Sequence, residues 1–277
     1  MELLKKYYRK LFIIFLFISS ILKSQYNCTI FKNENCRKAC ELANIAKEDQ
    51  GGKNSQIKFS EAIELCPTFD YAYSEKSVPY LKTGDFVTWK KLIDKAVEIN
   101  PRNNLGYRGW CQYQFLRNYK AAIKDIEDLE KLVGEDNVGF SQNGNYQLEI
   151  VKALCYKNIG NKQKAIEIIE HQLTKNNNHI FLFDYYHLGV LYYEVAKYSE
   201  AKLSFEKQIA NNDYYAEPYY YLSLIYTKEN NKVKAKEMID KALSYYSTNK
   251  SMKDAYTTII DKVYEEEMKN QQKILEY

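Results

Sequence analysis

The chain has 277 residues, of which 45% are hydrophobic and 27% charged, and only 4 are prolines and 10 glycines. This composition excludes wholesale disorder, and the scarcity of turn residues argues against an all-β fold. The net charge of +4 lies entirely in residues 1–24, and the remaining 35 basic and 35 acidic side chains cancel, so nucleic-acid binding is not expected.

The first 24 residues have the pattern of a secretory signal peptide. A basic stretch, Met1–Lys10, precedes Leu11–Leu22, a run of 12 residues without a charge, and a polar stretch comes next. As a helix, that run would cover about 18 Å, well short of the ~30 Å hydrocarbon core of a membrane. Cleavage near Ser24 is therefore expected, and an uncleaved anchor is the alternative. We expect an exported protein, periplasmic or secreted, with no membrane span once the signal is removed.

A period of 34 residues runs through the body of the chain. Pro67 and Pro101 lie 34 residues apart, and each ends an apolar-periodic stretch. The same interval separates four further pairs: Leu188 and Leu222, Tyr192 and Tyr226, Ala201 and Ala235, and Gln208 and Ala242. A fixed interval of this length is the signature of a repeat architecture, in which each unit buries its apolar face against its neighbours.

Residues 184–209, DYYHLGVLYYEVAKYSEAKLSFEKQI, carry the clearest copy of the pattern. Its large, small and aromatic residues resemble those of the tetratricopeptide repeat (TPR) family at Tyr185, Leu188, Gly189, Tyr192, Ala201 and Phe205. The resemblance covers most of residues 36–249. It implies an all-α, right-handed superhelix of about six helix-turn-helix repeats with a C-terminal capping helix. The approximate repeats are 36–69, 70–103, 104–136, 145–179, 182–215 and 216–249.

Three segments lie outside these repeats. Residues 25–35 form an N-terminal extension. The spacing between the third and fourth repeats is stretched, which predicts a protruding loop at 133–146. Residues 250–277 carry an apolar stripe at helical spacing, so a capping helix is expected there, with a coiled-coil segment as the alternative. The stripe consists of Ala255, Ile259, Val263 and Met268.

The resemblance implies a ligand surface on the concave wall, which the first helix of each repeat lines. The helical period places seven side chains of the fifth and sixth repeats on or near that wall: Phe183, Tyr186, His187, Tyr193, Tyr220, Tyr221 and Lys228. Tyrosine offers a rigid apolar ring and a hydroxyl, which suits peptide recognition, whereas packing between repeats is the alternative role of these rings. Some family members hold acidic peptide tails in a clamp of Lys, Asn and Arg. Only Asn44 matches that clamp, so it is not expected here.

Four of the six cysteines lie near the N-terminal end of the array, at Cys28, Cys36, Cys40 and Cys66. In an antiparallel helix pair, the start of the first helix lies beside the end of the second. We therefore expect Cys66 to bond Cys36 or Cys40, and Cys28 to take the one left over, in a compartment that permits disulfides. Their spacing does not match a zinc site and no histidine lies nearby, so no metal is expected.

Catalysis has little support in the sequence. The three histidines, His171, His179 and His187, occur in no metal-protease or zinc motif, so neither catalytic residues nor a cofactor are expected. We expect instead an exported scaffold that binds a protein or peptide partner in its concave groove. The alternative is an architectural component of an envelope assembly that uses the repeat edges and the 133–146 loop.

Overall fold

The computed structural model describes residues 26–175 and 180–276. The predicted signal peptide, residues 1–24, lies outside them. Within the described residues every regular element is helical, apart from one isolated β-bridge between Phe140 and Gln147. None of the helices in this part of the chain combines the length and the apolarity that crossing a membrane requires. The chain divides into two compact units between Ile99 and Asn100.

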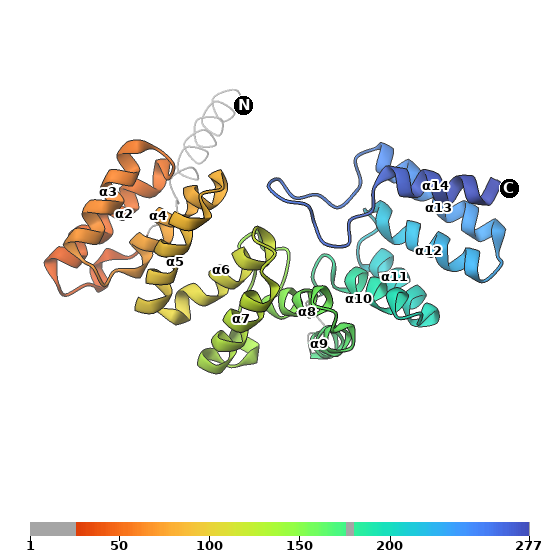
Figure 1. Cartoon of the computed structure of the whole chain (residues 1–277), viewed down its shortest axis with the longest axis horizontal. Helices are drawn as coiled ribbons and strands as arrows, with labels where there is room; N and C mark the ends of the chain where they lie inside the picture. The colour runs from red at the N-terminus through yellow and green to blue at the C-terminus, as the bar shows by residue number, and fades with distance from the viewer. Residues whose placement is uncertain (1–25, 176–179, 277) are drawn as a thin grey trace, which may run out of the picture. The chain divides into compact units, whose positions relative to one another are not determined.

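The first unit contains two helix pairs (Figure 1). Its helices are α2 (Glu34–Ala46), α3 (Lys53–Leu65), α4 (Asp70–Thr83) and α5 (Phe86–Ile99), and the 3-10 turns η1 (Cys28–Ile30) and η2 (Lys47–Asp49) flank α2. α2 packs on α3 and α4, and α4 packs on α5. The small, fully buried side chains Ala39, Ala43 and Ala62 let the helix axes approach, and Phe59 fills the remaining space.

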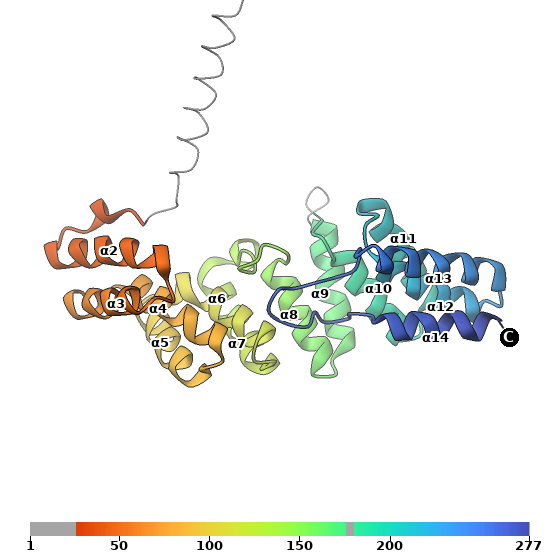
Figure 2. The ribbon, with the colours of Figure 1, turned by 90° about the horizontal axis from the view of Figure 1, so that it is seen from above.

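The second unit contains four helix pairs and a terminal helix (Figures 1 and 2). The pairs are α6 (Pro101–Gln114) with α7 (Tyr119–Val133), α8 (Leu148–Asn158) with α9 (Lys162–Lys175), α10 (Asp184–Glu194) with α11 (Tyr198–Asn211), and α12 (Ala216–Lys228) with α13 (Lys232–Ser247). The second helix of each pair packs on the first helix of the next: α7 on α8, α9 on α10 and α11 on α12. Each pair therefore buries its apolar face against a neighbour, as the 34-residue period predicts.

Short turns join the helices of a pair, and asparagine caps the second helix in three pairs of the second unit, whereas α11 follows Lys197 without a side-chain cap. Asn118, Asn161 and Asn231 each accept a hydrogen bond from a backbone N–H in the first turn of α7, α9 and α13. This bond satisfies one of the donors that the start of a helix leaves without a partner. The residue before each cap has a left-handed backbone: Arg117, Gly160 and Asn230.

Gly189 explains why the repeat pattern needs a small residue in the first helix of a pair. A methyl group at this position would lie 2.6 Å from Phe205 Cε1 of α11. Phe205 and Ala201 of α11 are both fully buried. The two helices of the pair can approach this closely only because α10 has no side chain at Gly189.

Residues 133–146, where the sequence predicts a protruding loop, form a non-α-helical insertion that is partly buried. After the turn η3 (Glu135–Asn137), the side chains of Val138, Ser141 and Tyr146 are buried. The ring of Tyr146 packs on Phe183, with 5.8 Å between ring centroids. Glu135 to Asn137, Phe140 and Gln142 to Gly144 are exposed, so one part of the insertion packs on the second unit and the other part faces solvent.

The expected helix over residues 250–277 begins only at Glu265. α14 (Glu265–Glu276) packs on α12 and α13, where Met268 is fully buried, so the end of the segment does form a cap. Residues 251–264 are not helical. Ile259 and Val263 of the predicted stripe are nevertheless buried, because the extended segment places them against the repeats.

Candidate functional site

The first helices of the pairs in the second unit, α6, α8, α10 and α12, together form a surface that we call the inner wall. α8 lies in contact with both α6 and α10. Residues 248–264 leave the end of α13, run back along this wall as far as α8, and return to α14 (Figures 1 and 2). An extended piece of the chain therefore lies on the surface where the sequence predicts a ligand.

Asp261 anchors this segment to the wall. Its Oδ2 lies 2.7 Å from His187 Nδ1 of α10, and its Oδ1 forms an ion pair with Lys157 of α8. Its backbone carbonyl accepts a hydrogen bond from the hydroxyl of Tyr186. The side chain of Asp261 is 7% exposed, that of Lys157 is 8% exposed and that of His187 is fully buried. The wall thus encloses one carboxylate between two nitrogen groups.

The electrostatics of this contact favour a charged carboxylate. Burial alone would raise the pKa of Asp261, but the hydrogen bond from His187 and the positive charge of Lys157 outweigh it and hold this pKa below its usual value. The backbone of Asp261 is left-handed, with φ of +64°, a conformation that aspartate adopts more readily than most side chains. Lys157 also pairs with Glu194 at 2.9 Å, so the ion pairs continue along α10.

Three further contacts hold the segment along its length. The backbone N–H of Met252 donates to Glu217 Oε1 of α12 at 2.8 Å. Gln114 of α6 donates to the hydroxyl of Thr257 at 2.6 Å, and Arg117 donates to the carbonyl of Thr258. Side chains from or next to all four helices of the inner wall therefore contact the segment.

Comparisons with known proteins place the fold. No protein-family model and no curated protein matches the sequence. A tetratricopeptide repeat protein from Parabacteroides merdae is similar in structure, with a TM-score of 0.52 and 17% identity over 86% of this chain and 84% of its own. PilW, a widely conserved type IV pilus biogenesis factor, gives a TM-score of 0.59 and 13% identity over 76% of this chain and 94% of its own. YrrB, a TPR protein with an unusual peptide-binding site, gives a TM-score of 0.53 and 18% identity over 68% of this chain and 92% of its own. The chain has the TPR fold. The prediction of helix-turn-helix repeats with a C-terminal cap is confirmed.

Three of the predicted wall residues in this TPR array are covered. Phe183, Tyr186 and His187 are buried, with exposed fractions of 3%, 1% and 0%. Tyr186 and His187 both bind Asp261, and Phe183 packs on the ring of Tyr215 at 5.1 Å. In this structure the three side chains contact the chain itself and offer no open surface to a partner.

The other four predicted residues keep part of their surface. Tyr193, Tyr220 and Tyr221 are half-buried, and Lys228 is exposed. Tyr221 joins the two other rings, with centroids 5.4 Å from Tyr193 and 5.3 Å from Tyr220. Lys228 lies over the ring of Tyr198 at 5.0 Å. The three tyrosines therefore pack between the helix pairs, and each keeps part of its surface exposed beside the stretch of wall that the segment covers.

The predicted set contains two of the residues that hold the segment, Tyr186 and His187, and lacks the others. Lys157 and Gln114 come from earlier pairs, whereas the predicted set is confined to the fifth and sixth repeats, and Asp261 comes from a segment that was expected to be helical. One local signal existed. Residues 257–260 are Thr-Thr-Ile-Ile, four β-branched residues in succession, and β-branched residues disfavour a helix.

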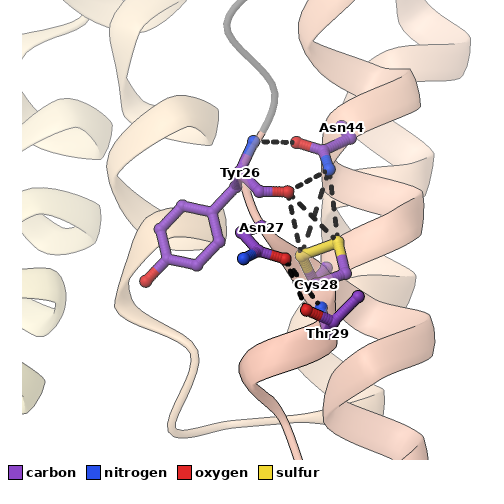
Figure 3. The surroundings of a disulfide bond; sticks show 6 residues. Tyr26, Asn27, Cys28, Thr29 and Asn44 are labelled. Atoms are coloured by element: carbon purple, nitrogen blue, oxygen red, sulfur yellow. Dashed lines mark hydrogen bonds between the residues drawn. A yellow bond between two sulfur atoms is a disulfide. The ribbon is translucent and has the colours of Figure 1, made fainter.

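The N-terminal residues of the first unit lie on α2 (Figure 3). The amide of Asn44 holds the backbone of Tyr26 twice: Tyr26 N–H donates to Oδ1 at 2.9 Å, and Nδ2 donates to the Tyr26 carbonyl at 2.9 Å. Asn44, the one match to the family's acidic-tail clamp, is therefore bound within the chain.

Disulfide bonds join the four N-terminal cysteines in two pairs. Cys28 bonds Cys40, with Cα atoms 5.5 Å apart, and Cys36 bonds Cys66, with Cα atoms 4.8 Å apart. This is one of the two pairings that the sequence left open. Both bonds lie within the first pair and the residues that precede it, so they fix the edge of the array.

A second cluster of charged side chains joins α7 to α8. Lys152 forms ion pairs with Glu130 and with Glu149, the latter at 2.8 Å. Burial and the neighbouring Glu130 raise the pKa of Glu149 to about 8. Among residues 26–175 and 180–276, no group of three or more His, Cys, Asp or Glu side chains is arranged to hold a metal ion. His179 lies outside the described residues, and the exposed His171 lies 3.3 Å from Glu135.

Proposed function

We propose that this TPR-fold protein is an exported scaffold that binds a protein or peptide partner on the inner wall of its second unit. The observation that supports the proposal is the extended segment on that wall, which side chains of four successive pairs contact. A surface that binds one extended chain through many side chains has the geometry to bind another. That YrrB, which shares the fold, has a peptide-binding site agrees with this assignment.

The half-buried tyrosines supply the apolar part of the proposed site. Tyr193 and Tyr220 lie on α10 and α12 beside the occupied stretch of wall, and each keeps an exposed part. Tyrosine rings lose little conformational entropy on binding and give a large contact area, which is why they dominate many binding surfaces.

Export is the second part of the proposal. The apolar run near the N-terminus follows the signal-peptide pattern, and two disulfides suit an oxidising compartment. PilW, a pilus biogenesis factor, gives an example of the TPR fold in a protein of that kind. Thiol labelling of the denatured protein from its native host should modify Cys111 and Cys155 before reduction and all six cysteines after it. Labelling of all six without reduction would contradict export.

A peptide selection tests the binding function. Peptides selected from a random library on the purified chain should lose at least 10-fold in affinity when Tyr220→Ala removes an exposed ring, a loss of about 1.4 kcal/mol or more. The matched control is Tyr185→Ala. This tyrosine of α10 is also half-buried, but its ring lies under Lys207 of α11, at 5.5 Å. An equal loss in both variants would place the binding elsewhere or indicate general destabilisation.

The architectural alternative uses a different surface and is separated by a third variant. Phe140 is the exposed aromatic residue of the 133–146 loop, with 59% of its surface accessible. If assembly with other envelope components is lost in Phe140→Ala and retained in Tyr220→Ala, the loop is the functional surface and the inner wall is not.

A further inference from the structure

Residues 251–264 are held to the inner wall by side chains. Among the described residues, no backbone-to-backbone hydrogen bond joins 251–263 to the rest of the chain, although Ala216 N–H donates to the carbonyl of Lys250 just before. Only three large apolar side chains of the segment are buried: Met252, Ile259 and Val263. A segment with few backbone hydrogen bonds and little buried apolar surface opens at a lower free energy than the helices beneath it.

The wall beneath the segment is built for a carboxylate. Lys157 and His187 come from different pairs, and both approach the carboxylate of Asp261. When Asp261 leaves, Lys157 keeps only Glu194 as an acidic partner on the wall, and His187 keeps none among the contacts described. A buried cation that loses its partner carries a desolvation cost, so the vacated wall favours another carboxylate over a neutral group.

The polar contacts just before Asp261 specify a ligand that is not helical. Gln114 donates a hydrogen bond to the hydroxyl of Thr257, and Arg117 donates one to the carbonyl of Thr258. Thr257 and Thr258 lie four and three residues before Asp261. Their partners lie on α6 and directly after it, whereas the carboxylate of Asp261 lies between α8 and α10. A helix would place residues of that spacing within about one turn. Here residues 258 and 259 have no regular structure and residues 260 and 261 form a turn, so the contacts require a peptide that is not helical.

We propose that residues 251–264 are an internal ligand of the inner wall, which a partner peptide displaces. The proposal rests on the proposed function and names the chemistry of the partner: a non-helical peptide with an aspartate that takes the place of Asp261 between Lys157 and His187. The free chain is then closed, and binding of the partner requires the internal segment to leave.

A labelled peptide with the sequence of residues 251–264, SMKDAYTTIIDKVY, tests the exchange. The internal segment is tethered at both ends and competes at a high effective concentration, so the peptide should bind the wild-type chain weakly. In the Asp261→Asn variant the internal segment loses the carboxylate that Lys157 and His187 contact, and fluorescence polarisation should show at least 10-fold tighter binding of the peptide. The same peptide with D261N should bind that variant at least 10-fold more weakly.

The matched control is Asp254→Asn. Asp254 carries the same charge in the same segment, but it accepts hydrogen bonds from the N–H groups of Tyr256 and Thr257 and not from the wall. This variant should bind the peptide as the wild type does. Equal affinities for the wild type and Asp261→Asn, or an equal gain in Asp254→Asn, would overturn the proposal.

A measurement on the wild-type chain removes the dependence on any variant. Trypsin should cut after Lys262 several-fold faster when the peptide is present at saturation, because the displaced segment is open to the protease, and intact mass identifies the fragment. An unchanged rate would overturn the proposal. If the Asp261→Asn chain is a dimer and its segment stays protected from trypsin, the wall binds a second copy of the chain. That result would also overturn the proposal. Neither result changes the outcome of the peptide selection with Tyr220→Ala, so the failure of this inference is distinguishable from the failure of the proposed binding function.

Discussion

At the scale of single residues, the packing of α10 on α11 depends on the absence of one methyl group. Besides Cε1 of Phe205, a Cβ at Gly189 would meet Cδ1 of the same ring at 2.8 Å. That ring is stacked on Tyr221, with centroids 5.1 Å apart, so it cannot move away without displacing a second ring. The close approach is therefore rigid on both sides.

We predict that Gly189→Ala lowers the free energy of unfolding, because an added methyl group in a packed core usually costs about 1–3 kcal/mol. The ~1 kcal/mol that alanine gains over glycine in a helix offsets part of this cost, so the net loss should be up to about 2 kcal/mol. Urea denaturation followed by helical circular dichroism measures the difference. Gly51→Ala is the control, because the nearest atom to an added Cβ lies 4.0 Å away. A neutral Gly189→Ala would contradict the packing argument.

Gly189 and Asp261 mark the limits of prediction at this scale. Gly189 was predictable because the repeat pattern recurs at a fixed interval and requires a small residue there. Asp261 was not, since its contact with His187 joins residues 74 apart in the sequence. The position of His187 on the wall followed from helical periodicity, but no local pattern specifies which distant residue will lie against it.

At the scale of elements, the helix pairs were predictable and the connections between and after them were not. Paired helices carry their own periodicity, so their existence follows from the sequence. The stripe at Ile259, Val263 and Met268 also has helical spacing, yet only Met268 lies in a helix. Contacts with Gln114 and Lys157 hold residues 257–261 in a non-helical form, which the β-branched side chains of residues 257–260 favour. In segments of this kind, tertiary contacts determine the backbone conformation.

Glu217 links α12 to the start of this segment and makes its stability depend on pH. The carboxyl is fully buried, and burial raises its pKa from 4.5 to about 7, although the N–H of Met252 and the charges of Lys253 and Lys262 oppose the shift. The folded state therefore keeps a proton that the unfolded state has lost. The contribution of Glu217 to the free energy of unfolding is fully present below about pH 4.5 and is lost as the pH rises to about 7.

We predict that Glu217→Gln removes this dependence. Between pH 5 and 7 the free energy of unfolding of the wild type should fall by up to about 1.4 kcal/mol per pH unit more than that of the variant. Asp184, with a pKa of about 6, and Glu149, at about 8, act in the same direction in both proteins, so the difference isolates Glu217. Denaturation at several pH values gives both slopes. Parallel slopes would show that Glu217 titrates normally.

At the scale of the whole molecule, the two units rely on different sources of stability. The first has two helix pairs, which bury a small core, and it contains both disulfides. The second has four pairs and a cap, and its two cysteines, Cys111 and Cys155, are free and buried. Short arrays bury less apolar surface per residue, so a covalent constraint contributes most where the array is shortest.

Reduction should therefore act on one unit. The Cys36–Cys66 bond closes a loop of 30 residues, which in the loop-entropy model is worth roughly 3–4 kcal/mol. We predict that a mild reductant raises the amide hydrogen exchange rates of α2 and α3 by about 100-fold or more, since each 1.4 kcal/mol is a factor of ten. Exchange in α10 to α13 should not change, because no disulfide lies in that part of the described chain. A uniform increase across both units would mean that they unfold together, and no increase in α2 and α3 would mean that packing alone holds the N-terminal edge.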